Sequence, residues 1–310
     1  MRWLPGSQLQ TIVPAFWPVP ELSSPTETEL VTVEEGSAVG IDINRPQGRP
    51  RGTVLLIHGM GGCSTSAYML YTALCAVERG WVAVRMNLRN CGGHERHART
   101  LYNAGQSQDA ERVLEAMDSI DGGLPRPFLA AGFSMGGNLL LRYAGLQGVA
   151  ARADAVVGVN APVDLERCLL ALEFKRNWHY QTHFIVRLCG QLRRILQVRP
   201  LPGPPPLARK IRTLRRFDTL YTAPDGGYRS VDEYYAVASA GPHLSKIRKP
   251  ALILSPANDP LVPVEMFESH HGNPALEIRN PVAGGHCGWQ PGSCRSWVGQ
   301  AILDWFEQRS

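Results

Sequence analysis

The chain lacks the cysteine patterns that indicate metal sites or disulfide frameworks. Its 310 residues include seven cysteines, an odd number, at positions 63, 75, 91, 168, 189, 287 and 294, and no two of them form a CxxC pair. We therefore expect neither a zinc site nor a network of disulfides. Scattered thiols of this kind are typical of a reduced, cytoplasmic protein.

Long uninterrupted apolar segments are also missing. The first twenty residues contain Pro5, Pro14, Pro18 and Pro20 and lack the apolar core of an export signal. The uncharged stretch 53–77 includes a histidine and several Gly, Ser and Thr residues, which favours strand, loop and helix over a membrane span. We expect no export and a soluble protein.

Charge of one sign is not in large excess. The 32 Lys and Arg against 27 Asp and Glu give a net charge of +5, which does not indicate a nucleic-acid partner. Hydrophobic residues make up 44% of the chain and charged residues 19%, so an intrinsically disordered protein is excluded.

What the chain does contain is an alternation of short apolar runs with helical spacings. Residues 27–33 and 39–43 alternate or are β-branched, as paired strands at a sheet edge are. The later runs are continuously apolar, which is typical of strands buried on both faces of a parallel sheet. They span 53–59, 81–88, 127–132, 155–160, 251–256 and 275–280, and helices are expected near 66–79, 107–119, 135–147, 263–270 and 297–308. The pattern predicts an α/β fold with a mostly parallel central sheet and helices on both faces.

The alternation stops in the middle of the chain. Residues 162–242 show helical segments at 165–174 and 183–198 and a proline cluster at 199–206, but no clear buried strand. We interpret 162–242 as a helical cap inserted into a single α/β core, which comprises residues 1–161 and 243–310.

One motif indicates a nucleophile. Residues 132–136, GFSMG, match G-x-S-x-G directly after an apolar strand and directly before a helix. In that context the turn holds the serine in a strained conformation, small flanking residues are needed, and the Ser134 hydroxyl is presented at the carboxyl end of the strand. A serine in a glycine-rich turn is often only structural, but the flanking strand and helix favour the nucleophile.

A second turn supplies candidate donors for an oxyanion. His58-Gly59-Met60-Gly61-Gly62 follows the buried strand 53–57. Ester cleavage passes through a tetrahedral oxyanion that needs fixed N–H donors, and we assign these to the main chain of Met60 and Met135. Met135 also begins a helix, where the helix dipole favours negative charge.

The base and the acid are assigned from their positions after the last two strands. His286 follows the last strand in a glycine-flanked loop, and Asp259 follows the preceding strand. A serine needs such a base, and the base needs an acid that orients it. The other candidates are less favourably placed: Asp154, Asp164, Asp225 and Asp232 for the acid, and His94, His97, His179, His183, His243, His270 and His271 for the base.

These motifs, with several other segments, resemble the YheT-like hydrolases. The matching strings are LPGSQLQTIVPAF (4–16), HGMGG (58–62), NLRNCGGH (87–94), LYNAGQSQDA (101–110), GFSMGGN (132–138), RRFDTLYTAPDGGYRSVDEYY (215–235) and GGH (284–286). The resemblance runs over nearly the whole chain, and its N-terminal and FD…GY…YY segments are more specific than the fold requires. It implies an α/β-hydrolase fold and a carboxylic ester hydrolase in which Ser134, Asp259 and His286 are the nucleophile, acid and base, with no metal or organic cofactor.

Two positions depart from the family pattern. Arg89-Asn90 stands where the family has an arginine-glycine pair, and Asn103 stands where it has a histidine. Neither belongs to the three assigned catalytic residues, but both lie in loops near the expected pocket. The substrate preference of relatives is therefore not transferred to this chain.

The expected cap is strongly basic. Residues 163–216 contain twelve Lys and Arg against three Asp and Glu, a net charge of +9, so the rest of the chain carries −4. Within 183–198, Phe184, Leu188, Leu192 and Ile195 share one helical face, with arginines elsewhere. A basic amphipathic helix over a site indicates either transient contact with anionic lipid or a solvated cationic face on a packed helix.

The sequence therefore predicts a serine hydrolase that cleaves a small-molecule acyl ester through an acyl-enzyme. Acyl transfer to an alcohol and a lipid-active enzyme, such as a phospholipase or monoacylglycerol lipase, use the same residues. A non-enzymatic binding protein on this fold is expected to lose one of the three catalytic residues, and all three are present.

Overall fold

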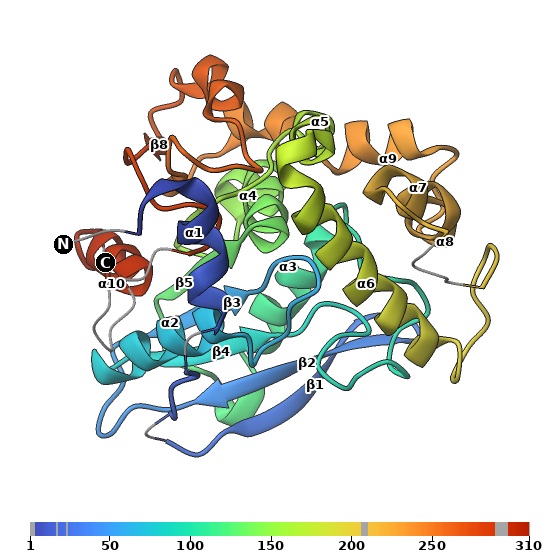
Figure 1. The fold of residues 1–310 in the computed structure, drawn as a ribbon. Coiled ribbons are helices and arrows are strands. Elements are labelled where there is room, and N and C mark those ends of the chain that lie inside the picture. Colours follow the sequence, from blue (N-terminus) through green and yellow to red (C-terminus); the bar gives the residue numbers. More distant parts are fainter. Residues whose placement is uncertain (1–3, 17, 23, 206–209, 289–296, 310) are drawn as a thin grey trace.

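An eight-stranded mixed sheet forms the centre of the molecule in the computed structural model, which describes residues 4–16, 18–22, 24–205, 210–288 and 297–309 (Figure 1). Cys294 and Arg209 lie outside these residues. The strands are β1 (Glu27–Glu34), β2 (Ser37–Asn44), β3 (Thr53–Ile57), β4 (Val82–Met86), β5 (Phe128–Phe133), β6 (Ala155–Val159), β7 (Ala251–Leu254) and β8 (Leu276–Arg279). The start and the end of each strand lie within two residues of the positions expected from the sequence.

The strand order is β1-β2-β4-β3-β5-β6-β7-β8. β1 pairs antiparallel with β2, and β2 pairs antiparallel with β4, while β4 and all later neighbours are parallel. The predicted α/β fold with a mostly parallel sheet is confirmed, and β1 with β2 forms the expected antiparallel edge.

Helices cover both faces of this sheet (Figure 1). The α-helices are α1 (Gly6–Ile12), α2 (Ala67–Glu78), α3 (Ser107–Ala116), α4 (Met135–Gln147), α5 (Leu165–Glu173), α6 (Trp178–Ile195), α7 (Leu214–Phe217), α8 (Ala223–Asp225), α9 (Val231–Ala238) and α10 (Trp297–Glu307). Short 3-10 helices are η1 (Val13–Phe16), η2 (Ile120–Gly122), η3 (Gly148–Ala150), η4 (Lys175–Asn177), η6 (Gly241–Lys246) and η7 (Val264–His270), and η5 (Asp218–Thr222) is a π-helical turn.

The apolar runs are continuous because alternate residues enter different cores. In β3, Val54 and Leu56 pack in a core with residues of α2 and α10, whereas Leu55 and Ile57 pack in the core that contains α3 and α4. Successive side chains of a strand point to opposite faces, so a strand covered on both sides needs apolar residues at every position.

Between β6 and β7 the described residues form helices and turns but no strand. The helical segment expected to begin near residue 183 starts five residues earlier, at Trp178, and the N-terminal segment rich in proline forms α1. None of the described helices is both long and apolar enough to span a bilayer.

Candidate active site

Ser134 occupies a sharp turn between β5 and α4. Its backbone has φ of 51° and ψ of −119°, a left-handed conformation that is uncommon for a residue with a side chain. The turn is fixed because the Ser134 N–H donates to the carbonyl oxygen of Val159 (2.8 Å) and the Ser134 carbonyl accepts from the Asn138 N–H (3.0 Å). The strained turn expected from the motif is therefore present at this serine.

Each of the two glycines of the motif stands where a side chain would collide with the main chain. A Cβ on Gly132 would lie 2.2 Å from the carbonyl oxygen of Gly136, and a Cβ on Gly136 would lie 2.4 Å from the carbonyl oxygen of Ile57. Both contacts are with main-chain atoms that cannot rotate away. The first glycine lets the chain reverse direction, and the second lets the start of α4 reach the end of β3.

His286 lies between Ser134 and Asp259. Its Nε2 is 3.0 Å from the Ser134 hydroxyl oxygen, and its Nδ1 is 2.9 Å from Asp259 Oδ2. With Nδ1–H donating to the carboxylate, Nε2 is free to accept the serine proton. The structure thus brings together the three side chains assigned from the sequence, although they are separated by up to 152 residues along the chain.

Asp259 is held by four hydrogen bonds. Its Oδ1 accepts from the N–H groups of Leu261 (2.8 Å) and Val262 (3.1 Å). Its Oδ2 accepts from Asn160 Nδ2 (2.5 Å) as well as from His286. The carboxylate therefore has its orientation toward the imidazole fixed from both oxygens.

The charge of Asp259 dominates the titration of His286. Burial by itself lowers the pKa of this imidazole, but the negative charge of Asp259, together with Cys287, raises it by more. The pKa of His286 consequently lies well above its ordinary value of 6.5.

Met60 and Met135 lie beside Ser134, where the oxyanion donors are expected. Both residues line the same cavity as Ser134 and His286. The Met60 N–H donates to no acceptor within the described part of the chain. Met135 is the first residue of α4, a position whose N–H has no acceptor inside its own helix.

The loop that carries Met60 is held by side chains to which no individual role was assigned from the sequence. The Gly59 N–H donates to the Tyr68 hydroxyl and the Gly61 N–H donates to the Tyr102 hydroxyl, both at 3.0 Å. His58 is fully buried, donates from Nδ1 to the Gly59 carbonyl oxygen (2.8 Å) and accepts at Nε2 from the Leu88 N–H (3.0 Å). Burial lowers the pKa of His58 to about 4, so this histidine stays neutral and fixes the loop.

The N-terminal helix α1 supports the loop that carries His286. Thr11 Oγ1 accepts a hydrogen bond from the His286 N–H (2.9 Å). Gln10 Oε1 accepts from the Gly284 N–H (3.0 Å) and from Asn258 Nδ2 (2.8 Å), while Asn258 Oδ1 accepts from the N–H groups of Gly284 and Gly285. The N-terminal string that carried the family resemblance thus contacts the candidate base directly.

The rival candidates have other partners. Asp225 pairs with Arg199, Asp154 lies near Arg126 and Lys249, Asp164 caps α5 and Asp232 is largely exposed. The rings of His94 and His97 contact each other, and His179 bonds to Gln8. His183 and His243 lie in α6 and η6, His270 ends η7 and His271 follows it. None of these side chains bonds to Ser134, Asp259 or His286 in the described structure.

The positions that depart from the family pattern are structural. Arg89 is buried and forms a two-pronged ion pair with Asp109, with both N–O distances 2.7 Å. Asn103 Oδ1 accepts from the Gly105 N–H (3.0 Å) and from the Tyr228 hydroxyl (3.2 Å). Neither Arg89, Asn90 nor Asn103 lines the cavity, although residues next to Asn103 do.

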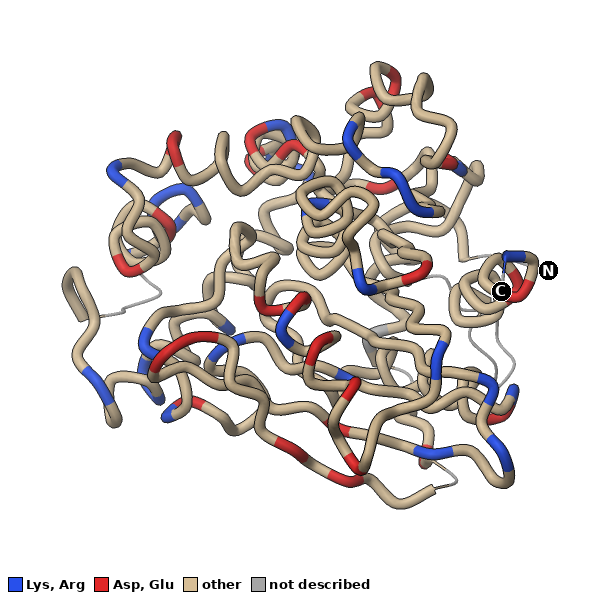
Figure 2. Tube along the Cα trace, turned by 180° about the vertical axis from the view of Figure 1, so that it is seen from behind, with Lys and Arg blue, Asp and Glu red and all other residues tan. Residues whose placement is uncertain are grey.

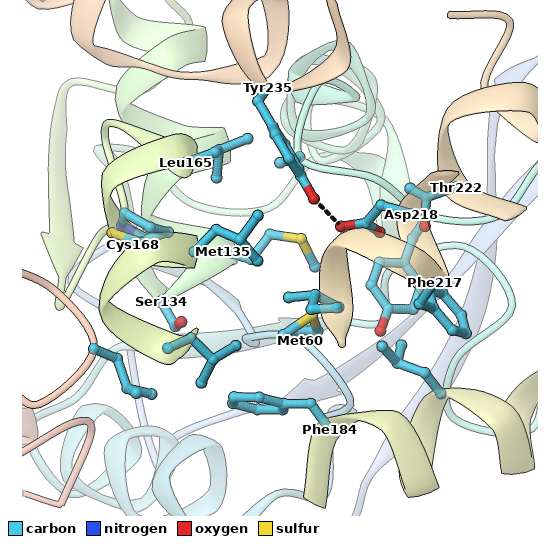
Figure 3. Close-up of a pocket in the computed structure, with 18 of the residues that line it drawn as sticks. Met60, Ser134, Met135, Leu165, Cys168, Phe184, Phe217, Asp218, Thr222 and Tyr235 are labelled. Carbon is cyan, nitrogen blue, oxygen red and sulfur yellow. Dashed lines mark hydrogen bonds between the residues drawn. The ribbon is translucent and has the colours of Figure 1, made fainter. Parts of the chain in front are cut away.

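A largely apolar cavity adjoins Ser134 (Figure 3). The space between its walls is about 950 Å³, a volume that includes space open to solvent. Its walls come from the core and from four elements of the middle segment: α5, α6, α7 and α9, with the turn η5. The helical face predicted in 183–198 lines it through Phe184, Leu188 and Leu192. A chain of CH₂ groups fits such walls better than a polar substrate does.

Comparison with known proteins identifies this architecture. A family model described as the alpha/beta hydrolase family matches residues 54–292. This range includes Ser134, Asp259 and His286. The chain belongs to the alpha/beta hydrolase family. The expected resemblance to YheT-like hydrolases is also confirmed, because the chain is 30% identical to the esterase-named protein YheT of Escherichia coli (strain K12) over 98% of this chain and 91% of that protein.

Two further similar proteins share less sequence with this chain than YheT does. Phospholipase ABHD3 of Mus musculus is 28% identical over 85% of this chain and 66% of its own length. The solved structure of the Pyrococcus furiosus esterase Pf2001 superposes with a TM-score of 0.63 over 93% of this chain and 91% of that chain. Its 14% identity supports the fold alone.

We expect Gln10→Ala to lower kcat for hydrolysis of a p-nitrophenyl ester by about tenfold to a hundredfold with little change in KM. The substitution removes the acceptor of Gly284 and Asn258, which frees the loop of His286, and small displacements of a catalytic group have effects of this size. Steady-state kinetics measure it. Gln8→Ala is the matched control, because Gln8 lies on the same helix but bonds to Asn177 and His179. An equal loss in both variants would contradict the positioning role.

Proposed function

We propose that the protein is a serine hydrolase that cleaves carboxylic acyl esters through an acyl-enzyme. The observation that carries the proposal is the series Ser134–His286–Asp259, with distances of 3.0 and 2.9 Å, at the wall of an apolar cavity. A hydroxyl, a base and an orienting acid in this arrangement are what nucleophilic ester cleavage requires.

The proposed reaction has two steps. Ser134 Oγ attacks the ester carbonyl carbon while its proton passes to His286 Nε2, and the N–H groups of Met60 and Met135 stabilise the oxyanion. His286 then gives that proton to the leaving alcohol, and the acyl group stays on Ser134. In the second step water attacks, His286 takes its proton and returns it to Ser134, and the carboxylic acid leaves. Neither step calls for a metal or an organic cofactor.

Substrate class follows from the cavity walls. Leucines, aromatic rings and methionines line most of it, which supports an ester with an apolar chain. The names of the similar proteins, an esterase in one case and a phospholipase in another, are consistent with a lipid-like ester. Acyl transfer to an alcohol would use the same residues, and no contact in the site favours it over hydrolysis.

Residues 162–242 are proposed to act as a cap. Helices α5 and α6 contribute Leu165, Leu169 and Leu188 to the cavity, and the Gln191 side chain donates to the carbonyl oxygen of Asn90 on the core (2.9 Å). A cap that excludes water strengthens the electrostatic interactions of the site.

Ser134→Ala is expected to reduce turnover of p-nitrophenyl esters by at least about a thousandfold, because no other hydroxyl replaces the nucleophile. Labelling by a fluorophosphonate probe, read by intact mass, is expected to disappear with it. Ser255→Ala is the control, since Ser255 is a buried serine whose hydroxyl has no hydrogen-bond partner among the described residues. Undiminished ester turnover by the purified Ser134→Ala protein would refute the assignment.

The raised pKa of His286 predicts the pH dependence. Only the neutral imidazole accepts the serine proton, so kcat/KM is low below the pKa of His286 and rises as the pH passes through it. Because Asp259 raises this pKa, the midpoint is expected above 6.5. Asp259→Asn removes the charge and is expected to move the midpoint down while lowering the plateau. A pH profile of kcat/KM tests this, and a midpoint that is unchanged in Asp259→Asn would contradict it.

We also propose transient contact of the cap with an anionic membrane. Leu170, Phe174 and Trp178, here called the aromatic patch, follow one another at intervals of four residues across the junction of α5 and α6, and each side chain is more than half exposed. Exposed Trp and Phe beside cations are typical of surfaces that enter a lipid interface.

The charges near the aromatic patch fit an anionic surface. Lys175 and Arg176 lie within the patch in sequence, and in the described structure neither forms an ion pair. The Arg176 guanidinium lies 5.4 Å from the centre of the Phe174 ring. Figure 2 shows acidic positions along the lower strands of the trace, where β1 and β2 lie, and further acidic positions among the upper helices. Those on α5 are Glu166 and Glu173, and both lie near Arg215. The net charge of +9 on residues 163–216 adds a general attraction.

We expect Phe174→Ser combined with Trp178→Ser to reduce binding to phosphatidylglycerol-containing vesicles by about tenfold, because two large apolar side chains no longer enter the interface. Vesicle sedimentation measures the binding. Val149→Ser is the control, since Val149 is 78% exposed but lies in η3 on the core. A docking role would be contradicted if the double variant bound these vesicles as tightly as the wild type does. It would also be contradicted if the wild type bound vesicles of phosphatidylcholine alone as tightly as vesicles that contain phosphatidylglycerol.

A further inference from the structure

One acid lies on the wall of the otherwise apolar cavity. Asp218 is the only Asp or Glu among the described residues that line it, and it is 7% exposed. No Lys or Arg of the described chain forms an ion pair with this carboxylate, which is unlike the buried acids Asp109 and Asp225. A buried carboxylate without a cation is costly unless hydrogen-bond donors reach it.

Asp218 has unused capacity to accept hydrogen bonds. Its Oδ2 accepts from the Tyr235 hydroxyl (2.8 Å), and the Thr222 hydroxyl also bonds to it. A carboxylate accepts about four hydrogen bonds, so two donors do not saturate it. Burial raises the pKa of Asp218 to about 6, while Thr222, Tyr235 and Arg215 act in the opposite direction. At neutral pH most of the molecules therefore carry a negative charge at this wall.

The backbone at Asp218 is irregular. Residues Asp218–Thr222 form a π-helical turn between α7 and α8, and π-helical turns are frequently found at functional sites. Figure 3 shows Asp218 and Ser134 on opposite sides of the cavity, with Met60 and Met135 between them. A substrate whose ester lies at Ser134 and whose chain is long enough to cross the apolar space would therefore reach the wall that carries Asp218.

We propose that Asp218 accepts a hydrogen bond from an O–H or N–H group that the substrate carries at the end remote from the cleaved ester. The proposal rests on the proposed ester hydrolase function and adds a specificity-determining residue to it. An ammonium group would gain more than a hydroxyl group does, because it meets a negative charge and because the rings of Tyr102, Phe217 and Tyr234 line the same cavity.

The experiment compares esters that differ only at the far end of the chain. One arm uses p-nitrophenyl esters of straight-chain acids that end in a methyl, a hydroxyl or an ammonium group, in a series of increasing length. The other arm uses acetate esters of alcohols with the same three ends, so that both orientations of the ester in the cavity are covered. The quantity measured is kcat/KM of each polar-ended ester relative to its methyl-ended partner.

Two variants separate charge from hydrogen bonding. Asp218→Leu is expected to lower both ratios by about tenfold or more, because the polar end then meets an apolar wall. Since each ratio is taken against the methyl-ended ester in the same variant, a general loss of turnover cancels. Asp218→Asn keeps an acceptor oxygen, so it is expected to lower the ammonium ratio and to leave the hydroxyl ratio within about threefold. Asp232→Asn is the control. Asp232 is an acid of α9 that does not line the cavity, because its side chain is 82% exposed and pairs with Arg215.

If the ratios are the same in wild type, Asp218→Leu and Asp218→Asn at every chain length and in both arms, Asp218 has only a structural role and the proposal is overturned. If Asp218→Leu does not fold, the ammonium ratio of Asp218→Asn decides in the same way. Failure of the proposed function would look different, because wild type would then cleave none of the esters or Ser134→Ala would cleave them all.

Discussion

The close approach of the start of α4 to the end of β3 is the constraint on which the candidate site depends. Because Gly136 has no side chain, its Cα comes so near the Ile57 carbonyl oxygen that a Cβ would lie 2.4 Å from it. This contact brings the turn of Ser134 beside the loop of Met60. The hydroxyl and the two candidate oxyanion donors therefore share one wall of the cavity without any flexible connection between them.

The base is held by contacts of a different kind. His286 lies in a loop after β8, and a loop alone would not hold an imidazole at hydrogen-bond distance from both Ser134 and Asp259. Three other segments fix it: Thr11 from α1, Asn258 from the loop after β7 and Asn160 from the end of β6. Since the parallel strands end at one edge of the sheet, the loops that follow β6, β7 and β8 meet there.

The features predicted from the sequence are those with a local signature. Strands β3 to β7 were recognisable because burial on both faces demands continuous apolar runs, and Ser134 because its turn demands glycines at fixed spacing. His286 was found from its place after the last strand. Asn160 and Gln10 were not found as site residues, because their partners lie 99 to 274 residues away and a lone amide has no spacing pattern. Asp218 was missed because its environment is created by α5, α6 and α9 only after they pack.

Tyr102 links the cavity wall to the loop of the candidate donors. Its ring lines the space that a substrate chain would occupy, and its hydroxyl is the acceptor for the Gly61 N–H, one residue after Met60. A chain long enough to push this ring aside would pull the acceptor away from the loop and tilt the Met60 amide. The size of a bound chain would then affect the chemical step as well as affinity, because a single hydrogen bond joins the Tyr102 ring at the cavity wall to the loop of the candidate oxyanion donors.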